Sequence, residues 1–367
     1  MGHGLAAGKS EGGGDVMGER LLMKGNEVIA EAALRAGCRH YFGYPITPQT
    51  EIAHYMAKVM PDAGGTFVQA ESEVAAINMV YGAAGAGARV MTSSSSPGIS
   101  LKQEGISYIA CARLPAVIVN IARCGPGLGG ILAAQGDYFQ AVKGGGHGDY
   151  NMIVLAPNSV QELYELTVEA FNLSDKYRVI TMIMGDGMLG QMMEAVEFRD
   201  EENIVACDKP WATDGSKLTR ERNIITSINT NPEILEAMNN TLQETYKLIR
   251  ENEPRAEIYN CDGAEIIITA FGTMSRIIKN VIADAEKEGI KIGLIRPITL
   301  WPFPDNEIKR YVDVPKAFLS VELNAGQMVQ DVRLAVNGQK PVHFYGRMGG
   351  MAPTQIEILE QVKKILQ

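Results

Sequence analysis

Cysteine is scarce in this chain, and the cysteines are scattered. There are five among 367 residues, and no two of them are spaced as C-x-x-C. An odd, dispersed set argues against a disulfide framework and a zinc ribbon, and an iron–sulfur cluster held by this chain alone would need several cysteines close together. We expect core thiols in a reducing cytoplasm and no metal site in this chain. The five are Cys38, Cys111, Cys124, Cys207 and Cys261.

Positive charge and long hydrophobic runs are also lacking. The 34 Lys and Arg residues stand against 43 Asp and Glu, which gives a net charge of -9. Nucleic-acid binding relies on clustered Lys and Arg, so this class of function is excluded. No apolar run approaches the ~20 residues of a membrane-spanning helix. Residues Met1 to Val16 are rich in glycine and lack the apolar core of a signal peptide. We therefore expect a cytoplasmic protein with a flexible tail at 1–16.

What the chain does contain is a regular alternation of strand and helix patterns. Between 17 and 198, short apolar runs such as Pro115–Ala122 alternate with helical stretches such as Thr50–Met60 and Glu73–Gly85. Strands this apolar are typical of the centre of a parallel sheet. The pattern predicts one doubly wound α/β domain over residues 17–198.

The rhythm breaks at residues 199–262 and then resumes. This segment is polar and irregular before one clear helix, which Asn231 can cap and which Pro232 can begin. We interpret it as a linker and helical strap. From 263 to 367 strands and helices alternate again, which predicts a second α/β domain with a parallel sheet and right-handed crossovers.

Candidate site residues gather in the loops between Tyr44 and Arg123, where α/β sheets build sites at the carboxyl ends of their strands. The first loop is Y-P-I-T-P, in which two prolines restrict the Thr47 hydroxyl. From spacing alone the better interpretation is that Thr47 caps a helix that Pro48 begins. A capping hydroxyl can also face a ligand, so the two interpretations are compatible.

The second loop carries two acids, Glu71 and Glu73. An average acid here is an exposed first-turn residue favoured by the helix dipole. The functional alternative is a buried carboxyl group that holds or passes a proton. Glu73 is the better candidate for that role, because a tightly apolar stretch containing Ala75, Ala76 and Met79 follows it.

Two further candidates follow the next strands. The loop Thr92 to Gly98 is either a flexible serine-rich loop or an anion- or cofactor-facing turn before a helix. Arg123 follows the most apolar strand of the chain, where it could bind a carboxylate through a bidentate fork. The alternative for Arg123 is a surface ion pair. His147, within G-G-G-H-G-D, is either structural or site-lining.

The triplet Gly185-Asp186-Gly187 is similar to the start of the metal–diphosphate motif of thiamine-diphosphate enzymes. That motif needs an Asn about two dozen residues later to complete a magnesium site. The corresponding stretch, 206–214, contains no Asn. We interpret the triplet as a tight turn, and we expect another chain to hold any metal and diphosphate.

Taken in order, Y-P-I-T-P, Q-A-E-S-E, T-S-S-S-S-P-G-I-S, G-G-G-H-G-D and V-E-L-N-A-G-Q-M form a specific combination. With it the chain resembles the α subunit of 2-oxoacid:ferredoxin oxidoreductases, most closely the group assigned to branched-chain 2-oxoisovalerate. The resemblance covers 17–367. It implies a pyrimidine-binding domain of the thiamine-diphosphate fold followed by a transketolase C-terminal-like domain. The implied reaction is oxidative decarboxylation of a 2-oxoacid to acyl-CoA and CO2 with reduction of ferredoxin.

The resemblance also implies roles for single residues. Glu73 would be catalytic, with its carboxyl group on the aminopyrimidine ring nitrogen of thiamine diphosphate. Thr47 and Arg123 would bind the substrate. The other cofactor-binding residues would be Ser95, Pro97 and Gly98.

Partner chains would complete the enzyme. The family implies a β subunit carrying the diphosphate–Mg2+ site, a γ subunit and a ferredoxin-like subunit with iron–sulfur clusters, and it implies coenzyme A and ferredoxin as reaction partners. Two alternatives stay open. One is a non-catalytic scaffold or regulatory subunit of the same complex, and the other is a self-contained thiamine-diphosphate lyase or transferase.

Overall fold

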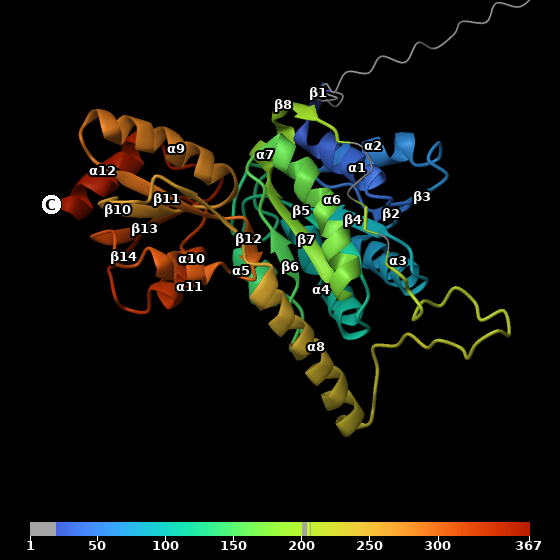
Figure 1. The fold of residues 1–367 in the computed structure, drawn as a ribbon. Coiled ribbons are helices and arrows are strands. Elements are labelled where there is room, and N and C mark those ends of the chain that lie inside the picture. Colours follow the sequence, from blue (N-terminus) through green and yellow to red (C-terminus); the bar gives the residue numbers. More distant parts are fainter. Residues whose placement is uncertain (1–19, 200–203, 206) are drawn as a thin grey trace, which may run out of the picture.

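The protein forms two α/β units that lie side by side (Figure 1). The structure, a computed structural model, describes residues 20–199, 204–205 and 207–367. The predicted tail at 1–16 and the predicted start of the folded chain at Met17 lie outside the described residues. Each unit has its own mainly parallel sheet covered by helices, so the predicted fold class is confirmed.

The first unit is organised around a seven-stranded sheet. Its strands are β2 (His40–Gly43), β3 (Thr66–Gln69), β4 (Val90–Ser94), β5 (Ala116–Ala122), β6 (Ile153–Leu155), β7 (Ile180–Asp186) and β12 (Thr299–Trp301). They stand in the order β12-β6-β7-β5-β4-β2-β3, and every neighbouring pair is parallel except β12 with β6. The whole length of β5 is buried, as its β-branched composition predicts for a central strand.

Helices cover both faces of this sheet. They are α1 (Gly25–Arg35), α2 (Thr50–Val59), α3 (Glu73–Gly85), α4 (Ser96–Cys111), α5 (Tyr138–Val142), α6 (Val160–Tyr177) and α7 (Gly187–Gln191). The bounds of α3 are those that the sequence predicts, because the Ser72 hydroxyl caps the helix by accepting a hydrogen bond from the Ala75 N–H. A short antiparallel ribbon of β1 (Arg20–Lys24) and β8 (Met193–Glu197) adds to the unit.

The second unit contains a five-stranded sheet in the order β14-β13-β10-β11-β9. The strands are β9 (Ala256–Tyr259), β10 (Ile266–Thr269), β11 (Ile292–Pro297), β13 (Ala317–Glu322) and β14 (Val342–Gly346), and the helices are α9 (Gly272–Lys287), α10 (Asp305–Arg310), α11 (Met328–Val336) and α12 (Gln355–Leu366). Two strands cross the predicted boundaries. β9 pairs with β11 although it falls in the predicted linker 199–262, and β12 returns to the first sheet from within 263–367.

The predicted strap helix is α8 (Pro232–Asn252), whose C-terminal end lies at the junction of the two units and whose remainder extends beside the first unit (Figure 1). Its predicted cap is confirmed: the Asn231 side chain accepts hydrogen bonds from the N–H groups of Glu233 and Ile234. Residues 207–231 before it contain no helix or strand. Of the predicted core thiols, Cys38, Cys124 and Cys261 are buried, whereas Cys111 and Cys207 are partly exposed.

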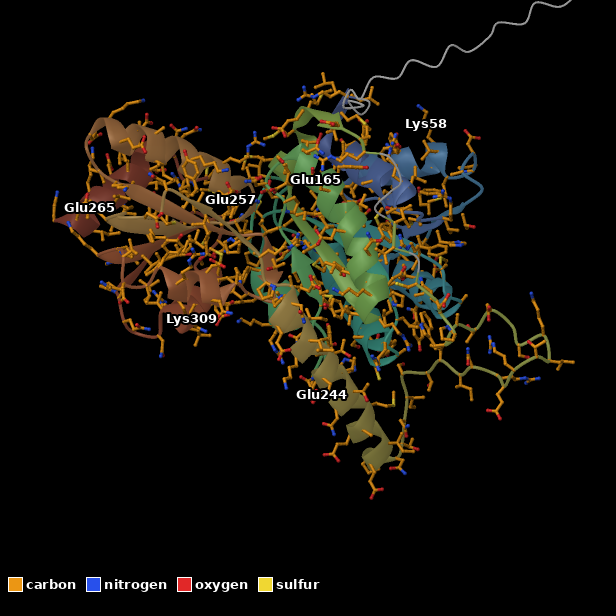
Figure 2. The ribbon with its side chains drawn as sticks, viewed as in Figure 1. Lys58, Glu165, Glu244, Glu257, Glu265 and Lys309 are labelled. Atoms are coloured by element: carbon orange, nitrogen blue, oxygen red, sulfur yellow. The ribbon has the colours of Figure 1, made fainter. Side chains whose placement is uncertain are left out.

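Polar residues hold the two units together. The side chain of Gln135 donates to the carbonyl of Phe271 (2.9 Å) and accepts from the N–H of Leu323 (3.1 Å). Arg296 of the second unit pairs with Glu162 of α6 in the first unit (2.7 Å), and Glu257, which lies where the units meet (Figure 2), holds the Arg296 guanidinium in place (2.7 Å). The junction is therefore a specific interface with oriented hydrogen bonds.

Candidate active site

The first pair of site residues meets at the carboxyl ends of β2 and β5. One terminal nitrogen of Arg123 donates to the carbonyl of Thr47 (2.9 Å), and the other donates to the carbonyl of Leu128 (3.0 Å). The side chain of Arg123 is 8% exposed and its Nε atom has no partner among the described residues. The alternative of a surface ion pair is wrong, because the guanidinium is buried and bonded to carbonyl oxygens.

The interpretation of Thr47 as a helix cap is also wrong. Helix α2 begins at Thr50, its N-cap residue is Gln49, and no side chain caps it. Thr47 lies before this helix and is exposed at the end of β2. The Thr47 hydroxyl is therefore not used as a helix cap. The backbone carbonyl of the same residue accepts a hydrogen bond from Arg123.

Glu73 is the first residue of α3 and is 6% exposed, whereas Glu71 is exposed. The expectation that Glu73 is the buried acid of the pair is confirmed. None of the described residues donates a hydrogen bond to its carboxylate. A buried carboxylate whose oxygens have no hydrogen-bond donor is a group available to a ligand.

The serine loop is a rigid strand-to-helix connection. Thr92, Ser94 and Ser95 are fully buried, β4 continues through Ser94 and α4 begins at Ser96, so the alternative of a flexible loop is wrong. Pro97 occupies the first turn of α4. The loop thus presents hydroxyl groups at a fixed place beside the carboxyl end of β4.

A buried acid supports this connection from behind. One carboxylate oxygen of Asp137 accepts hydrogen bonds from the Ser96 hydroxyl (2.6 Å) and from the Asn120 side chain (2.8 Å). The same Ser96 hydroxyl accepts a hydrogen bond from the backbone N–H of Arg123 (3.0 Å). Burial raises the pKa of Asp137 above its usual value, although these two hydrogen bonds oppose the rise. The start of α4 and the end of β5 are therefore tied together.

Gly98 lets Glu73 and the serine loop approach each other. A methyl group on Gly98 would lie 2.1 Å from the Ser94 hydroxyl oxygen and 2.6 Å from a carboxylate oxygen of Glu73. Both distances are far below van der Waals contact. The first turn of α4 thus forms a cradle in which a methyl group at position 98 would displace the Ser94 and Glu73 side chains.

We expect Gly98→Ala to reduce cofactor-dependent turnover about 10- to 100-fold, because the methyl group displaces the Glu73 carboxylate by an ångström or more. The fold should survive, since both contacts are with ends of side chains. Gly82→Ala on α3 is the control for stability, as no atom beyond its chain neighbours and the backbone of its own helix lies within 4 Å of the added methyl group. Thermal unfolding and dye-reduction assays check both variants. Full turnover in Gly98→Ala would contradict the importance of this cradle.

The residues of this cradle fit an aminopyrimidine ring. The hydroxyl groups of Thr92, Ser94 and Ser95 are buried without hydrogen-bond partners among the described residues, and the Glu73 carboxylate lies beside them. Buried polar atoms in native proteins are nearly always hydrogen-bonded, so several orphaned groups in one place indicate a ligand. A ring with nitrogen acceptors and an amino group would satisfy them.

The structure also contains a feature that the sequence did not predict. An apolar cleft of about 590 Å3 opens next to Thr47. The loop 123–150, which contributes to this cleft, has no periodic pattern from which the position of its residues could be predicted. The residues that line the cleft include Thr47, Pro48, Ile131, Leu132, Met188 and Met192.

Asp186 caps a helix, so the interpretation of Gly185–Gly187 as a tight turn is wrong. One carboxylate oxygen accepts hydrogen bonds from the N–H groups of Met188 (3.0 Å) and Leu189 (3.1 Å) at the start of α7. Burial raises the pKa of Asp186, although the hydrogen bonds from the Met188 and Leu189 N–H groups oppose the rise. Among the described residues no group of three or more His, Cys, Asp or Glu could hold a metal ion.

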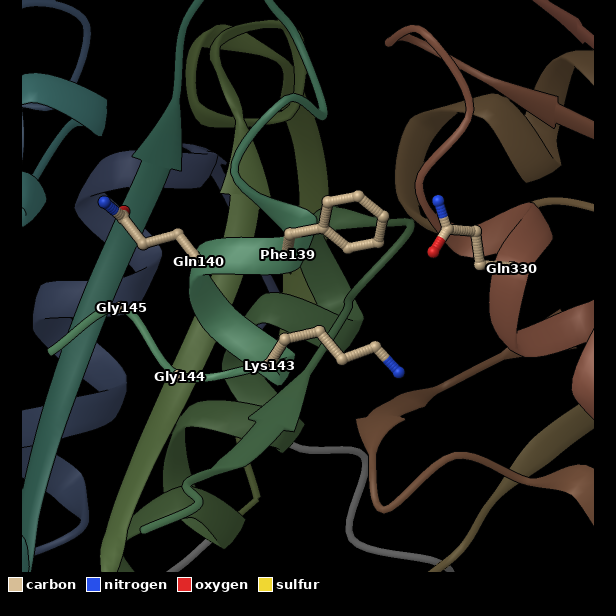
Figure 3. A pocket seen from close by; sticks show the side chains of 6 residues that line it. All are labelled: Phe139, Gln140, Lys143, Gly144, Gly145 and Gln330. Atoms are coloured by element: carbon tan, nitrogen blue, oxygen red, sulfur yellow. The ribbon is translucent and has the colours of Figure 1, made fainter. Parts of the chain in front are cut away.

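His147 lies away from these residues. Its ring is 3.5 Å from the Ser107 hydroxyl and packs edge-on against Tyr108, both in the last part of α4. The neighbouring hollow of about 530 Å3 lies between α5 and α11 (Figure 3). Its lining contains none of the predicted site residues, which favours the structural interpretation of His147. The lining residues are Phe139, Gln140, Lys143, Gly144, Gly145 and Gln330.

Comparison with known proteins matches the two units to two families. Residues 31–257 match the family described as "Pyruvate flavodoxin/ferredoxin oxidoreductase, thiamine diP-bdg", and residues 264–358 match "Pyruvate:ferredoxin oxidoreductase core domain II". No helix in the described parts of the chain has both the length and the apolar character needed to cross a membrane.

Relatives along the whole chain agree with these matches. The ketoisovalerate oxidoreductase subunit VorB of Methanothermobacter thermautotrophicus is 51% identical over 94% of this chain and 97% of its own length. The 2-oxoglutarate synthase subunit KorA of Methanocaldococcus jannaschii is 36% identical over 90% of this chain and 95% of its own length.

Solved structures give the same result. A 2-oxoglutarate:ferredoxin oxidoreductase from Magnetococcus marinus, solved with 2-oxoglutarate, coenzyme A and succinyl-CoA bound, is 27% identical with a TM-score of 0.86, covering 95% of this chain. This chain spans only 65% of that one. A split-gene transketolase at 13% identity and a TM-score of 0.57 shares the fold. The chain therefore belongs to the family of thiamine diphosphate-binding subunits of 2-oxoacid:ferredoxin oxidoreductases.

Proposed function

We propose that this chain supplies the aminopyrimidine-binding half of a shared active site. The assembled enzyme would oxidatively decarboxylate a branched-chain 2-oxoacid such as 2-oxoisovalerate to acyl-CoA and CO2, with reduction of ferredoxin. The observation that carries the proposal is the convergence of Glu73, the orphaned hydroxyls of the serine loop and the Thr47–Arg123 pair at one edge of the sheet. Ligands bind at this edge in open α/β sheets.

Glu73 would hold or pass a proton at the ring nitrogen of the cofactor. Its carboxylate would accept a hydrogen bond from the ring nitrogen, with Ser95, Pro97 and Gly98 shaping the wall against the ring. When bound, thiamine diphosphate supplies the nucleophile and the electron sink for decarboxylation. The low exposure of Glu73 strengthens its interaction with the ring, since little water reaches the side chain.

Arg123 and Thr47 would bind the oxoacid end of the substrate. A guanidinium has five N–H donors, and two backbone carbonyls take up two of them here. The remaining donors suit a carboxylate, and the fixed position of the group limits the loss of side-chain entropy on binding. The Thr47 hydroxyl lies on the loop that Arg123 binds, and it can donate a further hydrogen bond to the substrate.

The apolar cleft beside Thr47 would take the side chain of the substrate. Its walls include Ile131, Leu132 and Met188, which offer no charged partner to a second carboxylate. An apolar cleft favours an aliphatic side chain over an ionised one, because burial of an unpaired carboxylate is strongly unfavourable. This chemistry supports the branched-chain preference suggested by the names of the VorB relatives.

A partner subunit would cover an apolar rim around the site. The rim consists of exposed hydrophobic side chains in the loops and first two helical turns after β2, β3, β4, β5 and β7: Tyr44, Val74, Leu101, Leu128, Ile131, Leu132 and Met188. Exposed apolar patches of this kind mark interaction sites. We propose that a β subunit with the diphosphate–Mg2+ site docks here against α3.

The remaining parts of the reaction would also belong to other chains. The γ and ferredoxin-like subunits would provide the iron–sulfur clusters, and coenzyme A and ferredoxin would act in the cytoplasm. The scattered cysteines of this chain offer no cluster site of their own in the described residues, in keeping with this division.

Dye reduction with thiamine diphosphate, Mg2+, coenzyme A and 2-oxoisovalerate tests the proposal. We expect turnover from the complex isolated from its host and none from the purified chain. Turnover by the lone chain would favour a self-contained lyase or transferase. If neither preparation oxidises any 2-oxoacid, the chain is a scaffold or regulatory subunit.

A further inference from the structure

Lys102 is a buried cation that the proposed chemistry does not use. It lies in α4, its side chain is 0% exposed, and its Nζ atom has no hydrogen-bond partner among the described residues. Lysine is almost never fully buried unless it is paired. A cation in this state needs a counter-charge or a ligand nearby.

The packing of α3 against α4 places Lys102 beside Glu73. A methyl group on Gly98 would touch the carboxylate of Glu73 at 2.6 Å, and one on Gly105 would touch the Ile77 side chain at 2.5 Å. Lys102 lies between these two contacts, four residues after Gly98 and three before Gly105, and so on the same face of α4. Helical side chains lean toward the N-terminus, which directs the Lys102 stem toward Glu73.

The electrostatics agree with this placement. Burial lowers the pKa of Lys102 to about 8, and the charge of Glu73 is the one interaction that opposes this change. The other side chains of the cradle, from Thr92, Ser94 and Ser95, are uncharged hydroxyls. The carboxylate of Glu73 has no hydrogen-bond donor among the described residues. Two opposite charges that interact electrostatically therefore lie in the α3–α4 interface, with no hydrogen bond between them.

We propose that Lys102 is the counter-ion of Glu73 and a positioning residue for the reaction. Its ammonium group attracts the Glu73 carboxylate and so holds that side chain in the direction of the cradle. A carboxylate held in this direction can accept a hydrogen bond from a ring N–H. The inference rests on the proposed role of Glu73 toward the aminopyrimidine ring.

A double-mutant cycle on the full chain without cofactor tests the pair. Methionine is close in volume to lysine, so Lys102→Met removes the ammonium group and leaves the Glu73 charge unpaired. Glu73→Gln removes the carboxylate and leaves the ammonium group unpaired. We expect the double variant to unfold at a higher temperature than the sum of the two single effects predicts, because neither charge is then left unpaired.

Gln103→Met is the matched control. This buried neighbour on α4 packs against Gly145 and Gly146, so its effect should add to that of Glu73→Gln. Additive effects for Lys102 as well would overturn the pairing.

The pH dependence of the assembled enzyme tests the positioning role. In Lys102→Met we expect kcat/KM for 2-oxoisovalerate to fall about tenfold at pH 6 and much less at pH 9, because burial lowers the pKa of Lys102 to about 8 and the wild-type side chain has lost its charge at the higher pH. KM should stay unchanged. An equal loss at every pH would show a structural role only and would overturn the proposal. Because the cycle needs no cofactor, the pairing can be confirmed even if Glu73 proves dispensable for turnover.

Discussion

Glu73→Gln should lower turnover of the assembled enzyme by about 10²- to 10⁴-fold, the range that loss of a positioned acid or base produces. Glutamine preserves the length and the hydrogen-bonding shape of the side chain but cannot take up or release a proton. The glutamine side chain should fill the buried space that Glu73 occupies at the start of α3, so the complex should assemble. Steady-state kinetics should show the loss in kcat, with little change in KM for the oxoacid.

Glu71→Gln is the control for this result. Glu71 lies two residues earlier in the same loop and is exposed, so its neutralisation should change turnover less than twofold. Size-exclusion chromatography of both complexes checks assembly. A Glu73→Gln complex that assembles and turns over at the normal rate would remove this carboxylate from the chemistry and favour the scaffold alternative.

Local patterns were sufficient to predict most of the first sheet. Helix α3 has its predicted bounds because Ser72 supplies a cap and an Ala-rich stretch follows. The central strand β5 was evident from its β-branched run. Strands such as β9 and β12 were not predicted, because they are four and three residues long and lie at sheet edges, where pairing partners far along the chain decide the conformation.

The candidate site was predicted in part. Chain order alone places Thr47, Glu73 and Arg123 at the carboxyl ends of parallel strands, and the structure brings them to one edge of the sheet. The contact between Arg123 and the Thr47 carbonyl was not predictable, since it depends on the path of two loops. The local interpretations of Thr47 as a cap and of Arg123 in a surface pair failed for the same reason.

Lys102 shows where sequence patterns give no information. A lysine in an amphipathic helix is normally exposed, and nothing in its neighbours marks it as buried. Its burial follows from two glycines, Gly98 and Gly105, that allow α3 to approach α4 closely. Such an approach is a tertiary property, so a buried charge of this kind becomes visible only when both helices are in place.

The junction of the two units should depend strongly on Arg296. This side chain is 2% exposed, and its terminal nitrogens pair with both carboxylate oxygens of Glu162 at 2.7 and 2.8 Å while its Nε pairs with Glu257 at 2.7 Å. Arg296→Met would leave two carboxylates without their buried partner. Removing one member of a buried ion pair costs about 3–5 kcal/mol. Thermal unfolding followed by circular dichroism should show a marked fall in the midpoint.

Arg255→Met provides a matched comparison and the pH dependence a second test. Arg255 also pairs with an acid of α6, Glu169 at 2.9 Å, but both side chains are about one-third exposed, so the expected cost is about 0–1 kcal/mol.

Burial would raise the pKa of Glu257, but Lys279 and Arg296 hold it below its usual value. A lowered carboxylate pKa stabilises the fold above the unfolded-state pKa of about 4.3 and ceases to do so as the pH falls below it. The stability difference between the wild-type chain and Arg296→Met should therefore shrink below about pH 4. An equal effect of the two arginine substitutions at pH 7 would show that burial of the Arg296 cluster contributes nothing to the junction.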